Sequence, residues 1–456
     1  MKLRSLCALA AAASLSFVGC KKKEEPKPIA PAPVAAPAPS PSALAPTPTA
    51  LPVTPMASPS PNAAGGVAHF AVDKLGLVKL EGGKFTKVFD QPNNILQLAM
   101  APSGTLYLYA IGGVYKVEGG KAEKIGDYKS PGSLDRLALG ADGTLWGASF
   151  TGVSHYDGKT WTTEPKATLG GDVKLLRDIA VDAKGRVIVV SSNAVHVKEV
   201  GAWKTLDVKA AGVRSPIFFE RVAIAPSGTV YFGHSSGVLA WDGTSFSVIP
   251  LGSSFFSLRH MAIGPNEQLH IVSSTGLTLV PKGGRAQHHK LPHKAWAHGF
   301  AVDSTGQSWI TTDNGVYILD ATGSPIHWAQ GAIPELASTV KAVWVTGAGP
   351  LLPAVGPVAT GSITGKLLKN GEAQGSVTVE ACASPSSYFR KTPCSDAPWK
   401  QSFTTGADGV FTFKDVPLGA YRFAIKAGPK WSVGMSSCCA GMKAGKTFDV
   451  GSITLK

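Results

Sequence analysis

Five polar side chains recur at one position of a repeated pattern and could together hold a ligand. They are Gln97, Arg136, Asp178, Arg221 and His260, and each directly precedes an apolar residue and then an alanine. Guanidinium, amide, imidazole and carboxylate groups gathered in one place can bind an anionic or polar molecule. The same groups can instead pair with one another as structure, which is the usual state of a polar ring.

Two other groups of residues could do chemistry. Gly233-His234-Ser235-Ser236-Gly237 matches the G-x-S-x-G pattern of a hydrolase nucleophile, but that motif requires a strand, a turn and a helix. The equivalent segments of other repeats carry similar residues, so the repeat itself explains the match to the G-x-S-x-G pattern. The histidines 288, 289, 293 and 298 are close in sequence, yet no carboxylate partners for a metal are evident, and we interpret them as exposed polar residues on a loop.

The elements that must position the five polar residues come from a repeat of about 39–43 residues, the span of a four-stranded propeller blade. Leu98-Ala-Met-Ala-Pro-Ser-Gly-Thr-Leu-Tyr is matched in register by segments starting at Leu137, Ile179, Val222, Met261 and Phe300. The turn glycines fall at Gly104, Gly143, Gly185, Gly228 and Gly306, with Glu267 taking the place once. Later Asp-Gly pairs such as residues 157–158 indicate hairpins. Each unit is therefore predicted to be a strand–turn meander of four strands.

The first and last units are incomplete in complementary ways. The stretch from Ala68 to Phe89 lacks an inner strand, and the stretch from Val340 to Pro353 supplies one and lacks the rest. Together with six whole units they predict an all-β, seven-bladed β-propeller over residues 66–355, closed by pairing of its two ends. Closure would remove sheet edges that otherwise pair with other chains.

In this arrangement the polar position begins each inner strand, and it continues as Gly299 and Ala342 in the last two copies. Side chains alternate along a strand, so Leu98 and Leu137 are expected to point into the sheet stack and the alanines two residues after the polar position into the central channel. The five polar residues would then surround one mouth of the channel.

Residues 145–161, from Leu145-Trp146-Gly147 to Lys159-Thr160-Trp161, resemble the two-component-regulator propeller repeat. That resemblance covers about residues 66–355 and implies a propeller of the kind found in periplasmic sensor domains. No transmembrane helix or kinase domain is evident after it, so the resemblance implies the fold without a signalling output.

The repeat period breaks near Thr360, and residues 360–456 form a second module. Asn370-Gly371 predicts a hairpin and residues 376–381 alternate as a half-buried strand. The run from Thr404 to Phe423, with its Asp-Gly turn, Phe-x-Phe strand and Pro-x-Gly-x-Tyr turn, is similar to the carboxypeptidase regulatory-like domain. The resemblance implies a small prealbumin-like β-sandwich without catalytic residues.

Four cysteines lie in this module, namely Cys382, Cys394, Cys438 and Cys439. An even set in an oxidising compartment predicts two disulfides. Because a bond between adjacent cysteines would be strained, we expect Cys438 and Cys439 to reach separately to Cys382 and Cys394. The alternative, a four-cysteine zinc site, lacks the paired C-x-x-C spacing.

The N-terminus has the features of an export signal. Lys2 and Arg4 precede an apolar run of about a dozen residues, too short to span a bilayer, which closes on Val18-Gly19-Cys20. This resembles a bacterial lipoprotein signal over residues 1–19, although Phe17 stands where the family has Leu. The resemblance implies fatty acylation (palmitate) on Cys20; the alternative is an ordinary secretion signal. Residues 20–65, mostly Pro, Ala, Ser and Thr after a short Lys-rich start, are expected to be a disordered tether.

Charge and composition bear on one class of function, the binding of nucleic acids. The net charge is +14, yet part of it lies in the signal and in Lys21–Lys23, and no nucleic-acid-binding motif is evident. Nothing in the sequence requires a cofactor, a metal or an enzymatic activity. We therefore expect a non-enzymatic binding or scaffold lipoprotein of the cell envelope, on the outer membrane, with a protein or polysaccharide ligand.

Two alternative functions stay open at the level of sequence. One is an extracytoplasmic propeller enzyme of the lactonase or lyase type, which would need convergent carboxylates for a metal or a placed acid–base pair. The other is a sensor that acts through a partner protein.

Overall fold

The computed structural model describes residues 65–455 except 90–93, 128–133, 200, 214–216, 253–256, 292–295, 314, 321, 330, 354–357, 383–384, 386–390, 396, 398, 435–437 and 440, and the side chains of 135, 209 and 210. The export signal, Cys20, the tether and His293 lie outside the described residues. Within them, no helix has the length and apolar character needed to cross a bilayer.

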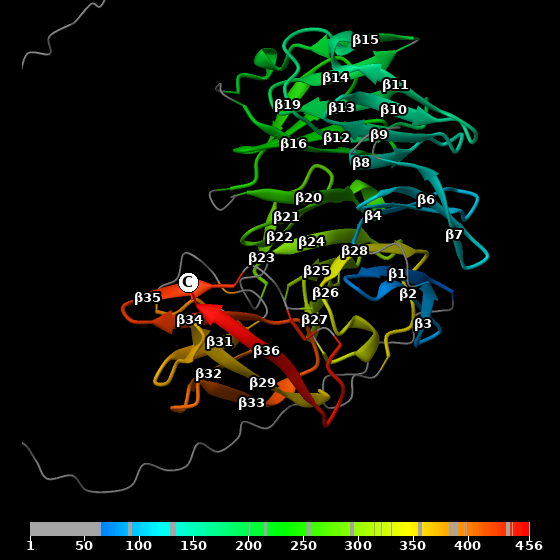
Figure 1. Ribbon diagram of the computed structural model, residues 1–456. Coiled ribbons are helices and arrows are strands. Elements are labelled where there is room, and N and C mark those ends of the chain that lie inside the picture. The colour runs from blue at the N-terminus through cyan, green and yellow to red at the C-terminus, as the bar shows by residue number, and fades with distance from the viewer. Residues whose placement is uncertain are drawn as a thin grey trace, which may run out of the picture. The chain divides into compact units, whose positions relative to one another are not determined.

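The repeats fold into four-stranded antiparallel sheets of the β-propeller type, each a meander of consecutive strands (Figure 1). Two of them are β4 (Ile95–Met100), β5 (Leu106–Ala110), β6 (Gly113–Glu118) and β7 (Lys121–Gly126), then β8 (Leu134–Leu139), β9 (Leu145–Ser149), β10 (Gly152–Tyr156) and β11 (Trp161–Pro165). The next two are β12 (Leu176–Val181), β13 (Val187–Ser191), β14 (Val195–Glu199) and β15 (Ala202–Leu206), then β16 (Phe219–Ile224), β17 (Val230–His234), β18 (Gly237–Trp241) and β19 (Phe246–Ile249). Two more are β20 (Leu258–Ile263), β21 (Leu269–Ser273), β22 (Gly276–Val280) and β23 (Gln287–His289), then β24 (Ala297–Val302), β25 (Ser308–Thr312), β26 (Gly315–Leu319) and β27 (Pro325–Ala329).

One further sheet combines the beginning and the end of the repeat region. Its order is β28 (Val340–Thr346), β1 (Val67–Val72), β2 (Gly76–Glu81) and β3 (Lys84–Phe89). Strand β28 pairs with β1 antiparallel, with Ala68 opposite Val345 and Phe70 opposite Val343. The two segments that the sequence predicts to pair are therefore hydrogen-bonded neighbours.

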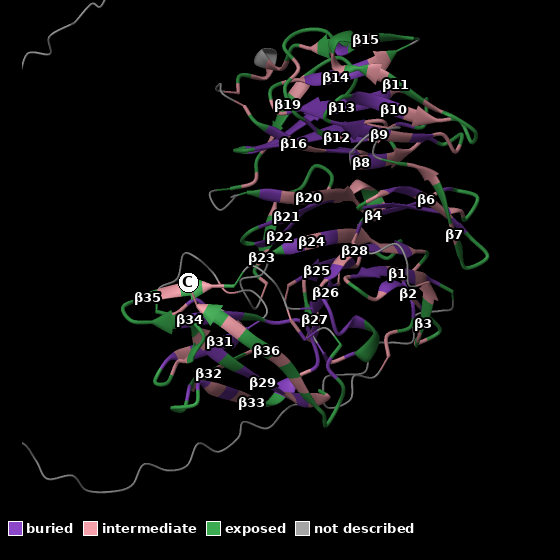
Figure 2. Ribbon diagram, viewed as in Figure 1, coloured by how far each residue is buried: buried purple, intermediate pink, exposed green. Residues whose placement is uncertain are grey.

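The first strands of the sheets lie beside one another in chain order. Strands β4, β8, β12, β16, β20 and β24 are successive neighbours, and β28 contacts both β24 and β4. The apolar core lies between successive sheets, as where Ile188 and Val190 of β13 pack against Phe219 and Phe232 of the next sheet. The second strands β13, β17, β21 and β25 are buried along their whole length, whereas first strands such as β20 are mostly half-buried (Figure 2). Hydrophobic burial between the faces of neighbouring sheets therefore stabilises the stack.

The turns after the inner strands are built as the repeat predicts. Gly104, Gly143, Gly185, Gly228 and Gly306 have φ values between 77° and 90°, where glycine carries no Cβ penalty. Glu267 occupies the same place at φ 56°, and its carboxylate binds Lys282 Nζ at 2.6 Å. Short 3₁₀ turns join other elements: η1 (Lys166–Leu169), η2 (Val208–Ala211), η3 (Pro265–Glu267) and η4 (Pro334–Leu336).

The C-terminal module is a pair of four-stranded sheets. The first contains β29 (Thr360–Lys369), β30 (Glu372–Ala373), β33 (Val410–Pro417) and β36 (Thr447–Leu455). The second contains β31 (Thr378–Cys382), β32 (Lys400–Thr404), β34 (Arg422–Ala427) and β35 (Lys430–Val433). Ile363 and Phe411 of the first sheet share one buried cluster with Val379 and Phe423 of the second, so the module is a small β-sandwich.

The predicted Asn-Gly hairpin and the Pro-x-Gly-x-Tyr turn both form turns between strands of the C-terminal module. Asn370 and Gly371 adopt φ of 53° and 86° between β29 and β30. Tyr421 donates its hydroxyl hydrogen to the Pro417 carbonyl oxygen at 2.6 Å, which fixes the turn between β33 and β34. Tyrosine hydroxyls that bind backbone a few residues upstream brace corners of other β-sandwiches in the same way.

The expected disulfide pairing is wrong, although all four cysteines are bonded. Cys382 pairs with Cys394, with 5.9 Å between their Cα atoms, and Cys438 pairs with its neighbour Cys439. The backbone of Cys438 is held by two hydrogen bonds to Tyr421, while Cys382 lies at the end of β31 within reach of Cys394. Cys439 has a φ of 74°, so the adjacent pair forms at a left-handed bend.

Candidate functional site

A β-bulge precedes the predicted polar position in six inner strands. The register shifts lie at Ile95/Gln97, Leu134/Arg136, Leu176/Asp178, Phe219/Arg221, Leu258/His260 and Ala297/Gly299. A bulge adds one residue to a strand and re-aims the side chains beside it. The same distortion in successive sheets turns equivalent side chains toward one place.

The structure brings all five predicted polar residues to one cavity of ≈ 230 Å³. Its lining includes Gln97, Arg136, Asp178, Arg221 and His260, together with Gly299 and Ala342 of the last two copies. Leu98 and Leu137 also contribute to the lining, although both are buried and belong to apolar clusters of the sheet stack. We call this space the mouth cavity.

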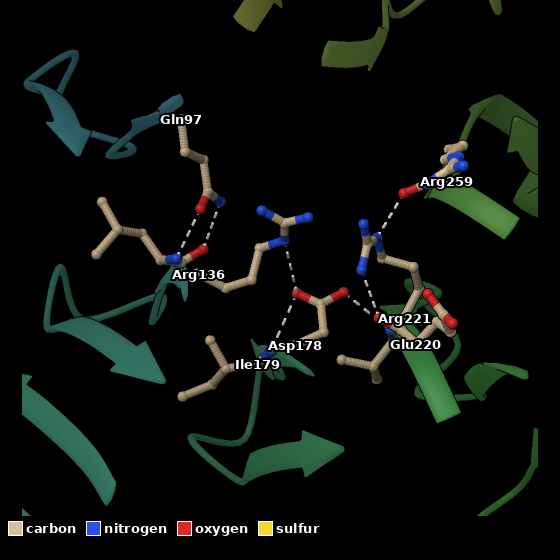
Figure 3. Close-up of polar contacts among 9 residues, drawn as sticks. Gln97, Arg136, Asp178, Ile179, Glu220, Arg221 and Arg259 are labelled. Atoms are coloured by element: carbon tan, nitrogen blue, oxygen red, sulfur yellow. Dashed lines mark hydrogen bonds and ion pairs between the residues drawn. The ribbon is translucent and has the colours of Figure 1, made fainter. Parts of the chain in front are cut away.

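Two of the polar side chains bind the backbone of the next inner strand (Figure 3). The Gln97 amide donates to the Leu137 carbonyl oxygen at 2.9 Å and accepts from the Leu137 N–H at 2.8 Å. The Asp178 carboxylate accepts from the N–H of Val222 at 3.1 Å and from that of Ile179 at 3.1 Å. These residues therefore join neighbouring sheets, which is a structural role.

Arg221 has the same kind of role as Gln97 and Asp178. Its Nε donates to the carbonyl oxygen of Arg259, and a terminal nitrogen donates to that of Glu220, both at 2.6 Å. Burial lowers the pKa of Arg221 to about 10, and repulsion from Arg136 adds to the shift. Arg221 therefore remains a cation at neutral pH.

Arg136 forms a long ion pair with Asp178. Its Nε lies 3.8 Å from Asp178 Oδ1, and Figure 3 shows the terminal nitrogens of the guanidinium pointing away from that carboxylate. Burial raises the pKa of the Asp178 carboxyl group, although Arg221 and Arg136 act in the opposite direction. Two guanidinium groups thus flank one carboxylate in the mouth cavity.

His260 contributes a neutral imidazole to the same cavity. Burial lowers the pKa of His260 well below its ordinary value, and Arg221 and Arg136 lower it further. An uncharged imidazole can accept or donate one hydrogen bond.

His298 also lines the mouth cavity, and the sequence interpretation of it was wrong. Rather than lying exposed on a loop, it belongs to β24, and its Nε2 lies 2.5 Å from Asp313 Oδ1. His288 and His289 belong to β23 rather than to a loop. In the part of the chain that the structure describes, no three metal-ligating side chains converge.

The G-x-S-x-G segment does not form a nucleophile elbow. Gly233 and His234 end β17 and Gly237 begins β18, so the motif is a strand–turn–strand hairpin. The Ser236 hydroxyl group lies 3.2 Å from His234 Nδ1 across this turn. The repeat explains the motif, as the sequence predicts.

Comparison with known proteins leaves the family open. No family model and no curated protein matches the chain. Virginiamycin B lyase from Staphylococcus aureus is 10% identical over 52% of this chain and 84% of its own, with a TM-score of 0.46. The extracellular domain of a putative hybrid two component system from B. thetaiotaomicron is 12% identical over 76% of this chain and 56% of its own, with a TM-score of 0.47.

PorZ, a surface component of the type-IX secretion system of Porphyromonas gingivalis, is 16% identical over 81% of this chain and 63% of its own, with a TM-score of 0.46. These identities lie below 25% and the TM-scores below 0.5. Function is therefore argued from the residues of this chain alone.

Proposed function

We propose that this chain is a non-catalytic binding protein of the cell envelope that recognises an anionic or polar ligand at the mouth cavity. The observation that carries the proposal is the convergence of Arg136 and Arg221 on one carboxylate, Asp178. A cavity with two cations and one anion favours a ligand that brings a negative charge.

The proposal includes a closed ring of seven blades, residues 66–355, around the channel. The pairing of β1 with β28 supports it, as does the position of β28 beside both β24 and β4. The side-chain bridges from Gln97 to Leu137 and from Asp178 to Val222 would then hold successive blades at a constant spacing. In a closed ring Arg136 and Arg221 would both face the channel beside Asp178.

Anchoring through a lipid on Cys20 is the second part of the proposal. Its support is the signal pattern that ends on Val18-Gly19-Cys20. Cells fed labelled palmitate should label the chain and should not label a Cys20→Ser variant. Membrane fractionation of both proteins then tests an outer-membrane location.

The experiment for ligand recognition is photo-crosslinking in intact cells. A photoreactive residue placed at Phe218, directly before β16 and three residues before Arg221, should yield a discrete adduct. That adduct should be lost when Arg136→Gln is added and retained with Arg285→Gln, which changes an exposed arginine at a distant turn. Equal adducts from position 248 of β19 would show that the mouth is not the recognition surface.

A second candidate function is an enzyme of the lyase or lactonase type. His298 hydrogen-bonded to Asp313 is a pair that can act as a general base, and His260 lines the same cavity. Turnover of lactone substrates that is lost in His298→Asn, together with stoichiometric metal in the purified chain, would favour this candidate over binding.

A further inference from the structure

Large apolar side chains are exposed at the edge of the sheets where the inner strands begin. Among the described residues nine large hydrophobic side chains are classed as exposed, and six of them lie at this edge. They are Leu96, Ile111, Phe150, Leu175, Phe218 and Trp296, with exposed fractions between 42% and 64%. We call these six residues the apolar rim.

Backbone hydrogen bonds place the rim residues at one edge. Ile111 N–H donates to the Asn94 carbonyl oxygen at 3.2 Å, which joins the turn after β5 to the start of β4. The Leu175 carbonyl oxygen accepts from Ser192 at 2.7 Å, and that of Phe218 accepts from Ser235 at 2.9 Å. Each bond joins the start of an inner strand to the neighbouring turn. These starts and turns form the edge of the sheets where the polar residues of the mouth cavity lie.

Cations accompany two aromatic rings of the rim. Lys166 Nζ lies 4.4 Å from the ring centroid of Phe150, and the Arg259 guanidinium carbon lies 3.3 Å from that of Trp296. The Arg259 carbonyl oxygen accepts the Arg221 Nε hydrogen bond at 2.6 Å, so one backbone segment joins the rim to the mouth cavity. The rim thus combines apolar area with positive charge.

We propose that the apolar rim and the mouth cavity bind an extended segment of a partner protein that carries apolar side chains and one acidic residue. The acidic side chain would enter the mouth cavity beside Arg136 and Arg221, and its apolar neighbours would cover the rim. The inference rests on the proposed function, because it specifies the ligand of the same cavity.

Three observations favour a protein segment over an acidic polysaccharide. The rim includes the aliphatic residues Leu96, Ile111 and Leu175, which offer no aromatic face on which a sugar ring could stack. The rim and the mouth cavity also contain aromatic residues and arginine, which are the residue types enriched at protein interfaces. The cavity of ≈ 230 Å³ is smaller than the roughly 300–1,000 Å³ typical of small-molecule sites and suits a single inserted side chain.

The test uses random dodecapeptides displayed on phage, selected against the purified full chain, with polygalacturonate as a second probe. Enriched peptides should combine Asp or Glu with aromatic or aliphatic residues. Synthetic copies should bind about tenfold more weakly to Phe218→Ser and to Arg136→Gln. Two matched controls, Val248→Ser for an exposed apolar residue outside the rim and Arg285→Gln for an exposed arginine, should leave affinity unchanged.

The outcomes separate this inference from the proposed function. Polygalacturonate binding that weakens with Arg136→Gln but not with Phe218→Ser would overturn the protein partner and leave recognition at the mouth standing. Peptide and polygalacturonate binding that are both absent, or both indifferent to Arg136→Gln, would overturn both. Thermal melting of each variant confirms that it is folded before binding is compared.

Discussion

The propeller sheets have two edges that are built in opposite ways. We call the edge where the inner strands end the turn edge and the edge where they begin the mouth edge. At the edge where inner strands end, turns repeat the same chemistry: Asp182 accepts hydrogen bonds from the N–H groups of Lys184 and Arg186, and Asp303 accepts from those of Thr305 and Gln307. At the edge where inner strands begin, bulges break the ladders, and apolar side chains are exposed beside partly buried cations.

Side chains at the turn edge therefore stabilise the sheets, whereas the mouth edge offers side chains to a binding partner. Aspartate and glycine at the turn edge satisfy backbone groups locally, so each turn stabilises its own sheet. At the mouth edge, side chains bind the backbone of the next sheet, or project toward a cavity. We therefore expect the largest loss of stability from a buried carboxylate at the turn edge, and we expect effects on binding from substitutions at the mouth edge.

The largest expected effect is that of Asp303→Ala at the turn edge. Asp303 is 3% exposed, and besides two backbone N–H groups it accepts from Trp309 Nε1 at 3.1 Å. Leaving these donors unpaired should lower the free energy of unfolding by about 3 kcal/mol in urea titrations. Asp142→Ala, at an exposed turn, should cost about 1 kcal/mol. Equal losses in the two variants would show that the burial of Asp303 adds nothing to the stability of its turn.

The second effect is a dependence of stability on pH that arises at a buried histidine. Burial lowers the pKa of His270 from 6.5 to about 4, and Asp303 opposes the shift. The unfolded chain then binds a proton below pH 6.5 that the folded chain does not bind until about pH 4, so stability falls as the pH falls through this window.

His270→Gln should remove about 2 kcal/mol of the loss that the native chain shows between about pH 6.5 and 5. His69, whose pKa burial also lowers to about 4, should continue to contribute to the slope in both proteins. The measurement is the urea midpoint across this range. Parallel curves for the two proteins would contradict the prediction.

Gln97→Leu tests the bridge between neighbouring sheets at the mouth edge. It removes two hydrogen bonds to the backbone of Leu137 and should lower the free energy of unfolding by about 1–2 kcal/mol. Leu96→Ala, at the exposed neighbouring position, is the matched control and should cost less than about 0.5 kcal/mol. A neutral Gln97→Leu would show that the sheets do not depend on this bridge.

The smallest effect on stability is expected for Phe218→Ser in the apolar rim. Phe218 is 52% exposed, so its removal should change the free energy of unfolding by less than about 0.5 kcal/mol, like Val248→Ser. Thermal melting compares the two variants. A large loss for Phe218→Ser alone would make the rim a structural feature rather than a surface for a partner.

Several parts of the candidate site were accessible to sequence reasoning. The register of the repeats identified Gln97, Arg136 and Asp178 as equivalent, and the structure places them at one cavity. Apolar residues such as Leu175, Phe218 and Trp296, each three residues before the polar position, were a signal for the rim that the sequence interpretation did not use. The partner of His298 was missed because Asp313 lies 15 residues away, in the turn after β25.

The sequence alone determined the period, the turns and the matching of the two incomplete units, because these depend on glycine, aspartate and the alternation of side chains over a few residues. Tertiary structure decided which cysteines pair, where the bulges fall, and that Gln97 and Asp178 bind the backbone of the next sheet. The hydrogen bonds of Gln97 and Asp178 join strands 40 and 44 residues apart in the chain, and only packing brings their donors and acceptors within hydrogen-bonding distance.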